Sequence, residues 1–245
     1  AQYGVLQGMI VPIVLLPSAL TFSLAVSLIP SLSEAAAVGD MKTIHKRLHQ
    51  SMRLALVTGA PFVVIMYVLA EPLCYYLYHD TEIAAMLRMM APIALFLYFQ
   101  APLQAALQAL DRPGTALLNT FVGACVKLVL IALLASKPQF GILGALLAIN
   151  ANIVLVTLLH GISVGKLTKF AMQVGDFVKV GCGMALMGIC CHYVMTVVWT
   201  DAPFVRFAAS CVSGLILYVI LIFAMNLVAR HDLARVPWIG RFFAR

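Results

Sequence analysis

Charged side chains are scarce in this sequence of 245 residues. They make up 10% of the chain, whereas hydrophobic residues make up 63%, and an ordinary soluble domain carries about 25% charged residues. A soluble protein of this length needs a polar surface that so few charged groups cannot provide. With a mean hydropathy of +1.03, most of the surface must face lipid. We therefore expect an integral membrane protein that crosses the bilayer several times.

Motifs for catalysis and metal binding are missing as well. The sequence has no HExxH motif, no glycine-rich phosphate loop and no nucleophile beside a base and an acid. The six cysteines lie inside apolar runs without a CxxC spacing, which favours packing roles over metal ligation or disulfides. The net charge of +7 is spread over short clusters, so a nucleic-acid surface is not expected. We expect no enzyme activity, no cofactor and no metal.

Apolar runs long enough to cross a bilayer occur seven times. A membrane-spanning helix needs about 20 apolar residues, and runs of this length are too long for barrel strands. Short polar turns such as "HDTE" at 79–82 and "DRPG" at 111–114 separate the runs. The sequence predicts an all-α membrane helix bundle with spans at 8–30, 53–77, 86–110, 114–136, 140–163, 177–199 and 204–228.

The connections between the spans differ in charge. One alternate set is rich in lysine and arginine: Lys42, Lys46, Arg47, Arg53, Arg112, Lys166, Lys169, Lys179, Arg230, Arg235, Arg241 and Arg245. The other set holds Arg88, Lys137 and Arg206 together with Glu71, Asp80, Glu82 and Asp201. Cytoplasmic loops carry the excess of basic residues. The sequence thus predicts an exterior N-terminus and a cytoplasmic C-terminus in a bacterial plasma membrane.

Two basic segments are expected at the cytoplasmic surface. In residues 41–53, Ile44, Leu48 and Met52 are four apart with basic residues between them, which favours an amphipathic helix that runs on into the second span. The tail pairs Trp238 with arginines and is also expected at the interface. Anchoring and topology explain both segments.

A polar stripe is predicted on the fourth span. Asn119, Gly123 and Lys127 are four residues apart and share one helix face. A charge at the centre of a membrane helix costs about 2.5–3.5 kcal/mol on insertion scales, so Lys127 requires an explanation. Either Lys127 lines a water-filled cavity, or its side chain extends to the exterior headgroups or pairs with another helix.

The third and fifth spans carry further polar residues. Gln100, Gln104 and Gln108 are four apart, and this face meets either water or another helix through hydrogen bonds. In the fifth span a small-residue face ends at Asn152, and close helix packing is the favoured interpretation there. The candidate substrate-binding residues are Lys127, Asn119, Gln100, Gln104, Gln108 and Asn152.

Prolines concentrate in the first three spans. Because proline removes a backbone hydrogen bond and bends a helix, these spans are predicted to bend and the last four to be straighter. The candidate gating positions are Pro12, Pro17, Pro30, Pro61 and Pro102.

Several motifs resemble those of bacterial flippases for lipid-linked oligosaccharides. The residues that carry the resemblance are Gly8, Pro12, "LPSAL" at 16–20, "SLIPSLSEA" at 27–35, "LQALDRPG" at 107–114, "NTFVGACVKLVLIALL" at 119–134 and "FGILGALLA" at 140–148. This is the polysaccharide-transporter branch of the superfamily that includes multidrug and toxin extruders, and the sequence is most similar to its stage V sporulation protein B group. Ala109, Asp111 and Arg112 depart from the family's Gly-Lys pattern.

The resemblance implies a fourteen-helix transporter with two lobes, of which this chain supplies spans eight to fourteen. On that basis residues 1–165 form five spans of the C-terminal lobe, and residues 166–245 form two additional helices and a basic tail. The chain lacks an initiator methionine and is expected to be a fragment, with an N-terminal lobe of the same transporter as its partner.

Alternating access is the mechanism that the resemblance implies. The cargo is a polyprenyl-pyrophosphate oligosaccharide or peptidoglycan precursor, whose anionic head would meet Lys127 while its tail stays among the membrane lipids. Two alternatives remain open from the sequence: a multidrug or cation extruder of the same superfamily, and a seven-helix receptor-like binding protein. A retinal protein is disfavoured because the seventh span has no lysine.

Overall fold

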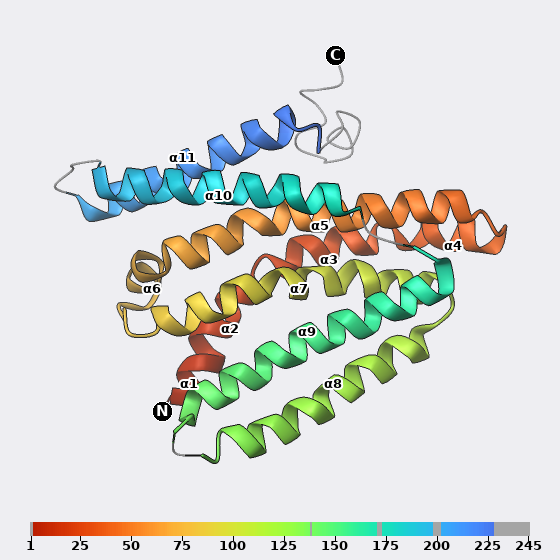
Figure 1. Cartoon of the computed structure of the whole chain (residues 1–245), viewed down its shortest axis with the longest axis horizontal. Helices are drawn as coiled ribbons and strands as arrows, with labels where there is room; N and C mark the ends of the chain where they lie inside the picture. The colour runs from red at the N-terminus through yellow and green to blue at the C-terminus, as the bar shows by residue number, and fades with distance from the viewer. Residues whose placement is uncertain (1, 138, 171–172, 198–201, 228–245) are drawn as a thin grey trace. The chain divides into compact units, whose positions relative to one another are not determined.

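The structure is a computed structural model that describes residues 2–137, 139–170, 173–197 and 202–227 (Figure 1). The chain divides into two compact units, Ala1–Gln173 and Val174–Arg245. Seven helical stretches are long and apolar enough to cross a membrane: Ser18–Ala37, Met41–Val68, Ala84–Ala109, Pro113–Leu134, Gly141–Thr168, Val174–Val197 and Pro203–Ala224. The predicted all-α bundle of seven spans is confirmed. The predicted basic tail lies outside the described residues.

The first part of unit 1 is a series of short helices. They are α1 (Gln2–Val5), the π-helix η1 (Leu6–Ile10), α2 (Val11–Leu15), α3 (Ser18–Val26) and α4 (Ile29–Ala37). The predicted span at 8–30 crosses two interruptions, whereas the stretch long enough to cross a membrane is Ser18–Ala37. The first span therefore lies further along the chain than the sequence predicted.

Prolines account for where these helices stop. A proline has no N–H to donate to the carbonyl group four residues earlier, and its ring clashes with that carbonyl. Helix α3 ends at Val26, four residues before Pro30, and α2 ends two residues before Pro17. Pro12 stands at the second position of α2, where a missing N–H is tolerated. Three of the five candidate gating prolines thus lie at helix ends.

Helix α5 (Met41–Val68) is continuous and includes the basic segment at 41–53. Gly39 ends the preceding helix with a φ of 70°, and Asp40 then caps α5 by accepting the N–H of Thr43 at 3.1 Å. Pro61 lies inside this helix. Helix α5 ends before Leu69, and the short helix α6 (Ala70–Tyr78) follows.

Helix α7 (Ala84–Ala109) is the centre of unit 1, with Pro92 and Pro102 inside it. It packs against α3, α4, α5, α6, α8 (Pro113–Leu134) and α9 (Gly141–Thr168). The buried side of α7 is rich in alanine, which lets its neighbours approach closely. Figure 1 shows α5, α7, α9 and α8 following one another across unit 1.

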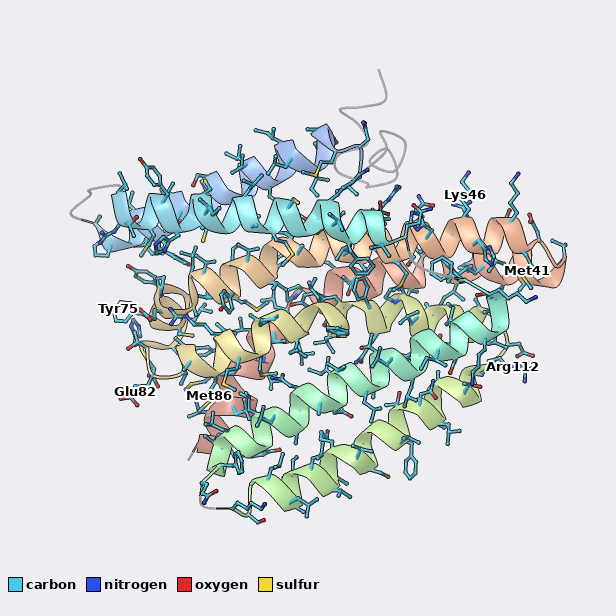
Figure 2. All side chains as sticks on the ribbon, viewed as in Figure 1. Met41, Lys46, Tyr75, Glu82, Met86 and Arg112 are labelled. Atoms are coloured by element: carbon cyan, nitrogen blue, oxygen red, sulfur yellow. The ribbon has the colours of Figure 1, made fainter. Side chains whose placement is uncertain are left out.

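The two ends of unit 1 differ in charge. Figure 2 shows Lys46 and Arg112 at the end where α5 and α8 begin, and Tyr75 and Glu82 at the opposite end. At the end that carries Tyr75 and Glu82, Arg88 forms an ion pair with Glu71 at 2.9 Å. The basic connections predicted for one side of the membrane therefore share one end of this unit.

Unit 2 is an antiparallel pair of helices, α10 (Val174–Val197) and α11 (Pro203–Ala224). The hydroxyl of Ser210 donates to the carbonyl oxygen of Cys191 at 2.6 Å. Gly214 lies against the same cysteine, where a Cβ atom would clash with the Cys191 sulfur. Small residues thus set the close approach of these two helices.

Candidate functional site

Gln100 connects α7 to α9. Its side-chain amide donates to the carbonyl oxygen of Ile153 at 3.0 Å and to the hydroxyl of Thr157 at 3.1 Å. Thr157 in turn donates to the carbonyl oxygen of Phe96 on α7 at 2.9 Å. In this conformation the Gln100 amide is therefore engaged between helices, which is the interhelical role that the sequence left open.

Asn119 connects α8 to α9 in the same way. The side chain is 8% exposed, and its amide donates to the hydroxyl of Ser163 at 3.0 Å. A buried amide inside a membrane protein needs a hydrogen-bond partner from the protein, because no water is there to bond it. Asn119 thus lies at the α8–α9 contact rather than toward lipid.

Gly123 lies one turn further along the same face of α8. A Cβ atom at this position would be 2.2 Å from Cγ2 of Val156 and 2.8 Å from Oδ1 of Asn152. Only a glycine leaves room for these two side chains of α9. The Oδ1 atom of Asn152 is buried and has no hydrogen-bond partner in the described part of the chain.

Lys127 lies one further turn along α8 and is half-buried. It forms no hydrogen bond or ion pair with any described residue. Lys127 stands about 12 Å beyond Asn119 along the helix axis, at ~1.5 Å per residue. It is therefore a cation inside a candidate span with no protein counter-charge among the described residues.

Gln104 and Gln108 are exposed on α7. Each step of four residues turns the side chain by roughly 40° around a helix. Gln100 therefore contacts α9, whereas Gln104 and Gln108 point progressively away from it. Neither Gln104 nor Gln108 bonds to a described residue. These two amides remain available to a ligand or to another part of the protein.

The register of α7 and α9 describes how the helices that carry the candidate residues run. Helices α7 and α9 run parallel, since their contacts occur in the same order along both: Met89 with Asn150, Phe96 with Thr157, and Leu103 with Gly161. The six candidate residues do not form one cluster. Gln100, Asn119 and Asn152 lie inside helix contacts, whereas Gln104 and Gln108 are exposed and Lys127 is half-buried.

Apolar side chains cover the opposite faces of the outer helices. Helix α8 exposes several large apolar residues: Leu117, Leu118, Phe121, Leu128, Val129 and Leu133. Helix α9 exposes Leu143, Leu147, Leu158 and Ile162. Exposed apolar faces of this kind suit acyl chains, as expected of helices that cross a bilayer.

Sequence reasoning did not find the hydroxyl partners on α9 or the role of Tyr98. Thr157 and Ser163 accept the two interhelical amides, but a threonine or serine within a span usually bonds to its own helix and gives no separate signal. Tyr98 on α7 is fully buried and donates to Val14 of α2 at 3.0 Å. The sequence signal for Tyr98 was a polar hydroxyl group within an otherwise apolar run. In the described residues no group of three His, Cys, Asp or Glu side chains could hold a metal ion.

Comparison with known proteins places the sequence among membrane transporters. The family model described as MatE matches residues 8–133. Stage V sporulation protein B of Bacillus subtilis (strain 168) is 36% identical over 249 residues, which cover 100% of this chain and 47% of that protein. Sporulation protein YkvU of the same organism is 34% identical over 171 residues, or 70% of this chain and 38% of that protein.

A lipid II flippase is similar in both sequence and fold. Lipid II flippase MurJ of Bacillus subtilis (strain 168) is 26% identical over 154 residues, covering 61% of this chain and 28% of that protein. A solved structure of lipid II flippase MurJ in the inward closed conformation matches with a TM-score of 0.70 and 20% identity, over 88% of this chain and 46% of that chain. The chain spans about half the length of stage V sporulation protein B and of the solved MurJ chain. It belongs to the MatE family of multi-pass membrane transporters, related to stage V sporulation protein B and to MurJ.

Proposed function

We propose that this chain forms part of a flippase that moves a lipid-linked oligosaccharide or peptidoglycan precursor across the bacterial plasma membrane by alternating access. The similarity to a protein named lipid II flippase supports the cargo class. The observation that carries the proposal is Lys127, a half-buried cation within α8 that forms no ion pair with any described residue.

The chemistry of the cargo fits an unpaired cation in this position. A polyprenyl-pyrophosphate sugar has a negatively charged, hydrated head that hydrocarbon excludes, and an apolar tail that hydrocarbon accepts. Lys127 would balance the charge of the pyrophosphate, while Gln104 and Gln108 would bond to sugar hydroxyls as the head passes. The exposed leucines of α8 would stay against acyl chains, and so would the cargo's tail.

Three candidate residues would reach the cargo only in another conformation. Gln100, Asn119 and Asn152 lie within the contacts between α7, α8 and α9. Alternating access is largely a rocking of one helical bundle against another, so these groups would reach the cargo only if α8 or α7 also moved away from α9. The broken segment 2–37 and the prolines at its helix ends would supply the bending that this movement needs.

A second lobe would complete the cavity. The chain spans about half of its relatives, and Gln104, Gln108 and Lys127 have no partner in the described part of it. We propose that an N-terminal lobe of the same transporter faces these three side chains. The basic end of unit 1, with Lys46 and Arg112, would lie in the cytoplasm by the excess of positive charge.

A multidrug or cation extruder is less well supported. Such a transporter would place carboxylates where its cations bind. In the described spans the carboxylates are Glu34 and Asp176, and each lies within four residues of a helix end. The unpaired charge deeper in the spans is positive, which favours an anionic cargo.

Complementation of a bacterial strain depleted of its lipid II flippase tests the proposal. The complete reading frame should restore growth, and Lys127→Ala should reduce transport of a labelled lipid-linked precursor at least tenfold at equal membrane abundance. That reduction corresponds to about 1.4 kcal/mol of lost charge stabilisation. Lys127→Arg keeps the charge and should retain most of the activity.

Lys137→Ala is the matched control, because Lys137 is an exposed lysine beyond the end of α8. It should transport like the unsubstituted protein. Full transport by Lys127→Ala would remove the charge from the mechanism. Failure of the unsubstituted reading frame on lipid II, with success on another polyprenyl-pyrophosphate glycan, would change the cargo but not the cargo class.

A further inference from the structure

The break at Pro17 leaves carbonyl groups that side chains must satisfy. Across the break, backbone bonds run from the N–H of Leu16 to Pro12 and Ile13, and from the N–H groups of Leu20 and Thr21 to Pro17. The carbonyl oxygen of Leu15 accepts the hydroxyl of Ser18. A carbonyl at membrane depth without a donor costs several kcal/mol, so each of these groups needs a partner.

The carbonyl oxygen of Val14 receives its donor from a different helix. The hydroxyl of Tyr98, in the middle of α7, donates to it at 3.0 Å. Tyr98 is 0% exposed and Val14 is 1% exposed, so water cannot replace this bond. The bond joins the last turn before the break to the central helix of unit 1.

Gly59 on α5 determines where the Tyr98 ring lies. A Cβ atom on Gly59 would be 2.4 Å from Cδ2 of the ring. The ring therefore fills the space that the missing side chain leaves, and its position fixes the direction of the hydroxyl. Tyr98 thus contacts two other parts of unit 1, α5 through its ring and α2 through its hydroxyl.

Other polar links in unit 1 join its long helices to one another. Gln100 and Thr157 connect α7 to α9, and Asn119 connects α9 to α8. Residues 2–16 differ, because the break separates them from α3. The Ser18 hydroxyl links them to α3 at the break itself, and the Tyr98 hydroxyl links them to α7.

We propose that Tyr98 is the positioning residue of a hinge at Pro17. While its hydroxyl holds the Val14 carbonyl, residues 2–16 are fixed against α7. When the bond opens, these residues turn about the break, because Pro17 supplies no N–H to rebuild a continuous helix. The inference stands on the geometry of unit 1, and its role in moving cargo rests on the proposed function.

Hydrogen–deuterium exchange of the complete reading frame in lipid nanodiscs tests the hinge. Tyr98→Phe keeps the ring on Gly59 and removes only the hydroxyl. Backbone amides of residues 11–22 should exchange about tenfold faster, as expected for the loss of one buried hydrogen bond. Amides of α9 should exchange at the same rate as in the unsubstituted protein. Faster exchange confined to residues 11–22 is the result expected of a hinge, whereas a general loss of stability would accelerate exchange throughout the bundle.

Two further variants complete the test. Tyr218→Phe is the matched control, a buried tyrosine in unit 2, and it should leave residues 11–22 unchanged. Gly59→Ala displaces the ring instead of removing the hydroxyl and should accelerate exchange in the same residues. Unchanged exchange in Tyr98→Phe, or equal acceleration of residues 11–22 and of α9 in both Tyr98→Phe and Gly59→Ala, would overturn the proposal. Because the measurement uses no cargo, its failure is distinct from failure of the transport assay.

Discussion

Replacing Gly123 by alanine tests whether α8 is held against α9 as closely as the structure indicates. The added Cβ would lie 2.2 Å from Cγ2 of Val156, and ordinary contact begins at 3.4 Å. The two atoms must therefore separate by at least 1.2 Å (3.4 − 2.2). Val156 is β-branched and strongly prefers one rotamer in a helix, so the helices are expected to move apart instead.

The size of the effect follows from this displacement. Overpacking a well-filled contact costs about 1–3 kcal/mol. For a protein of this size each kcal/mol lowers the melting temperature by roughly 2–4 °C. Gly123→Ala should thus reduce the melting temperature by about 2 °C or more, although alanine is the better helix former.

Thermal unfolding of the purified protein in detergent measures the change, and a second substitution identifies its cause. Val156→Ala removes the clashing methyl groups, so the double variant should be more stable than the sum of the two single variants predicts. Gly181→Ala is the control, because a Cβ on Gly181 meets no atom within 4 Å. An unchanged melting temperature in Gly123→Ala, or strict additivity in the double variant, would refute the close α8–α9 contact.

Two other substitutions separate structural from functional roles. Asn119→Ala removes the bond to Ser163 and should lower the free energy of unfolding by about 0.6 kcal/mol, a typical value for interhelical bonds in membranes. The variant should transport the labelled precursor at a rate within twofold of the unsubstituted protein at equal abundance. A tenfold loss of transport would show that Asn119 contacts the cargo. The Thr43 hydroxyl and N–H hold the pKa of the Asp40 carboxyl below its usual range. Because a lowered folded-state pKa stabilises the fold only while the group is ionised, the first turn of α5 should lose protection from amide exchange as pH falls below about 4. Asp40→Asn should remove this pH dependence, and an unaltered profile would contradict it.

The hydrophobic pattern was sufficient to predict the number of spans but not their ends. A 20-residue window selects the most apolar stretch, and residues 2–37 are apolar enough to place that window in several positions. The helix breaks determine where the first span lies, and they occur where Pro17 and Pro30 lack an N–H group to donate. The predicted span at 53–77 also crossed a break, because α5 ends at Val68, four residues before Pro72.

Helix periodicity predicted the polar stripe on α8 but not what each residue touches. The four-residue spacing places Asn119, Gly123 and Lys127 on one face, and the first two lie against α9. Their partners, Ser163 and Val156, come from a helix whose rotation and register depend on packing. No spacing rule on a single helix indicates which of its polar groups a neighbour will occupy. The binding role of Lys127 stays a prediction.

The continuity of α5 has a consequence for the membrane around the protein. Its 28 residues extend about 42 Å at ~1.5 Å per residue, whereas a hydrocarbon core is about 30 Å thick. Roughly two turns must stand outside that core unless the helix tilts. These are the turns that carry Lys42 and Lys46, so a thicker or thinner bilayer changes how deeply two ammonium groups sit among the phosphates. Lipid composition would in this way act on α5 directly, through thickness and surface charge together.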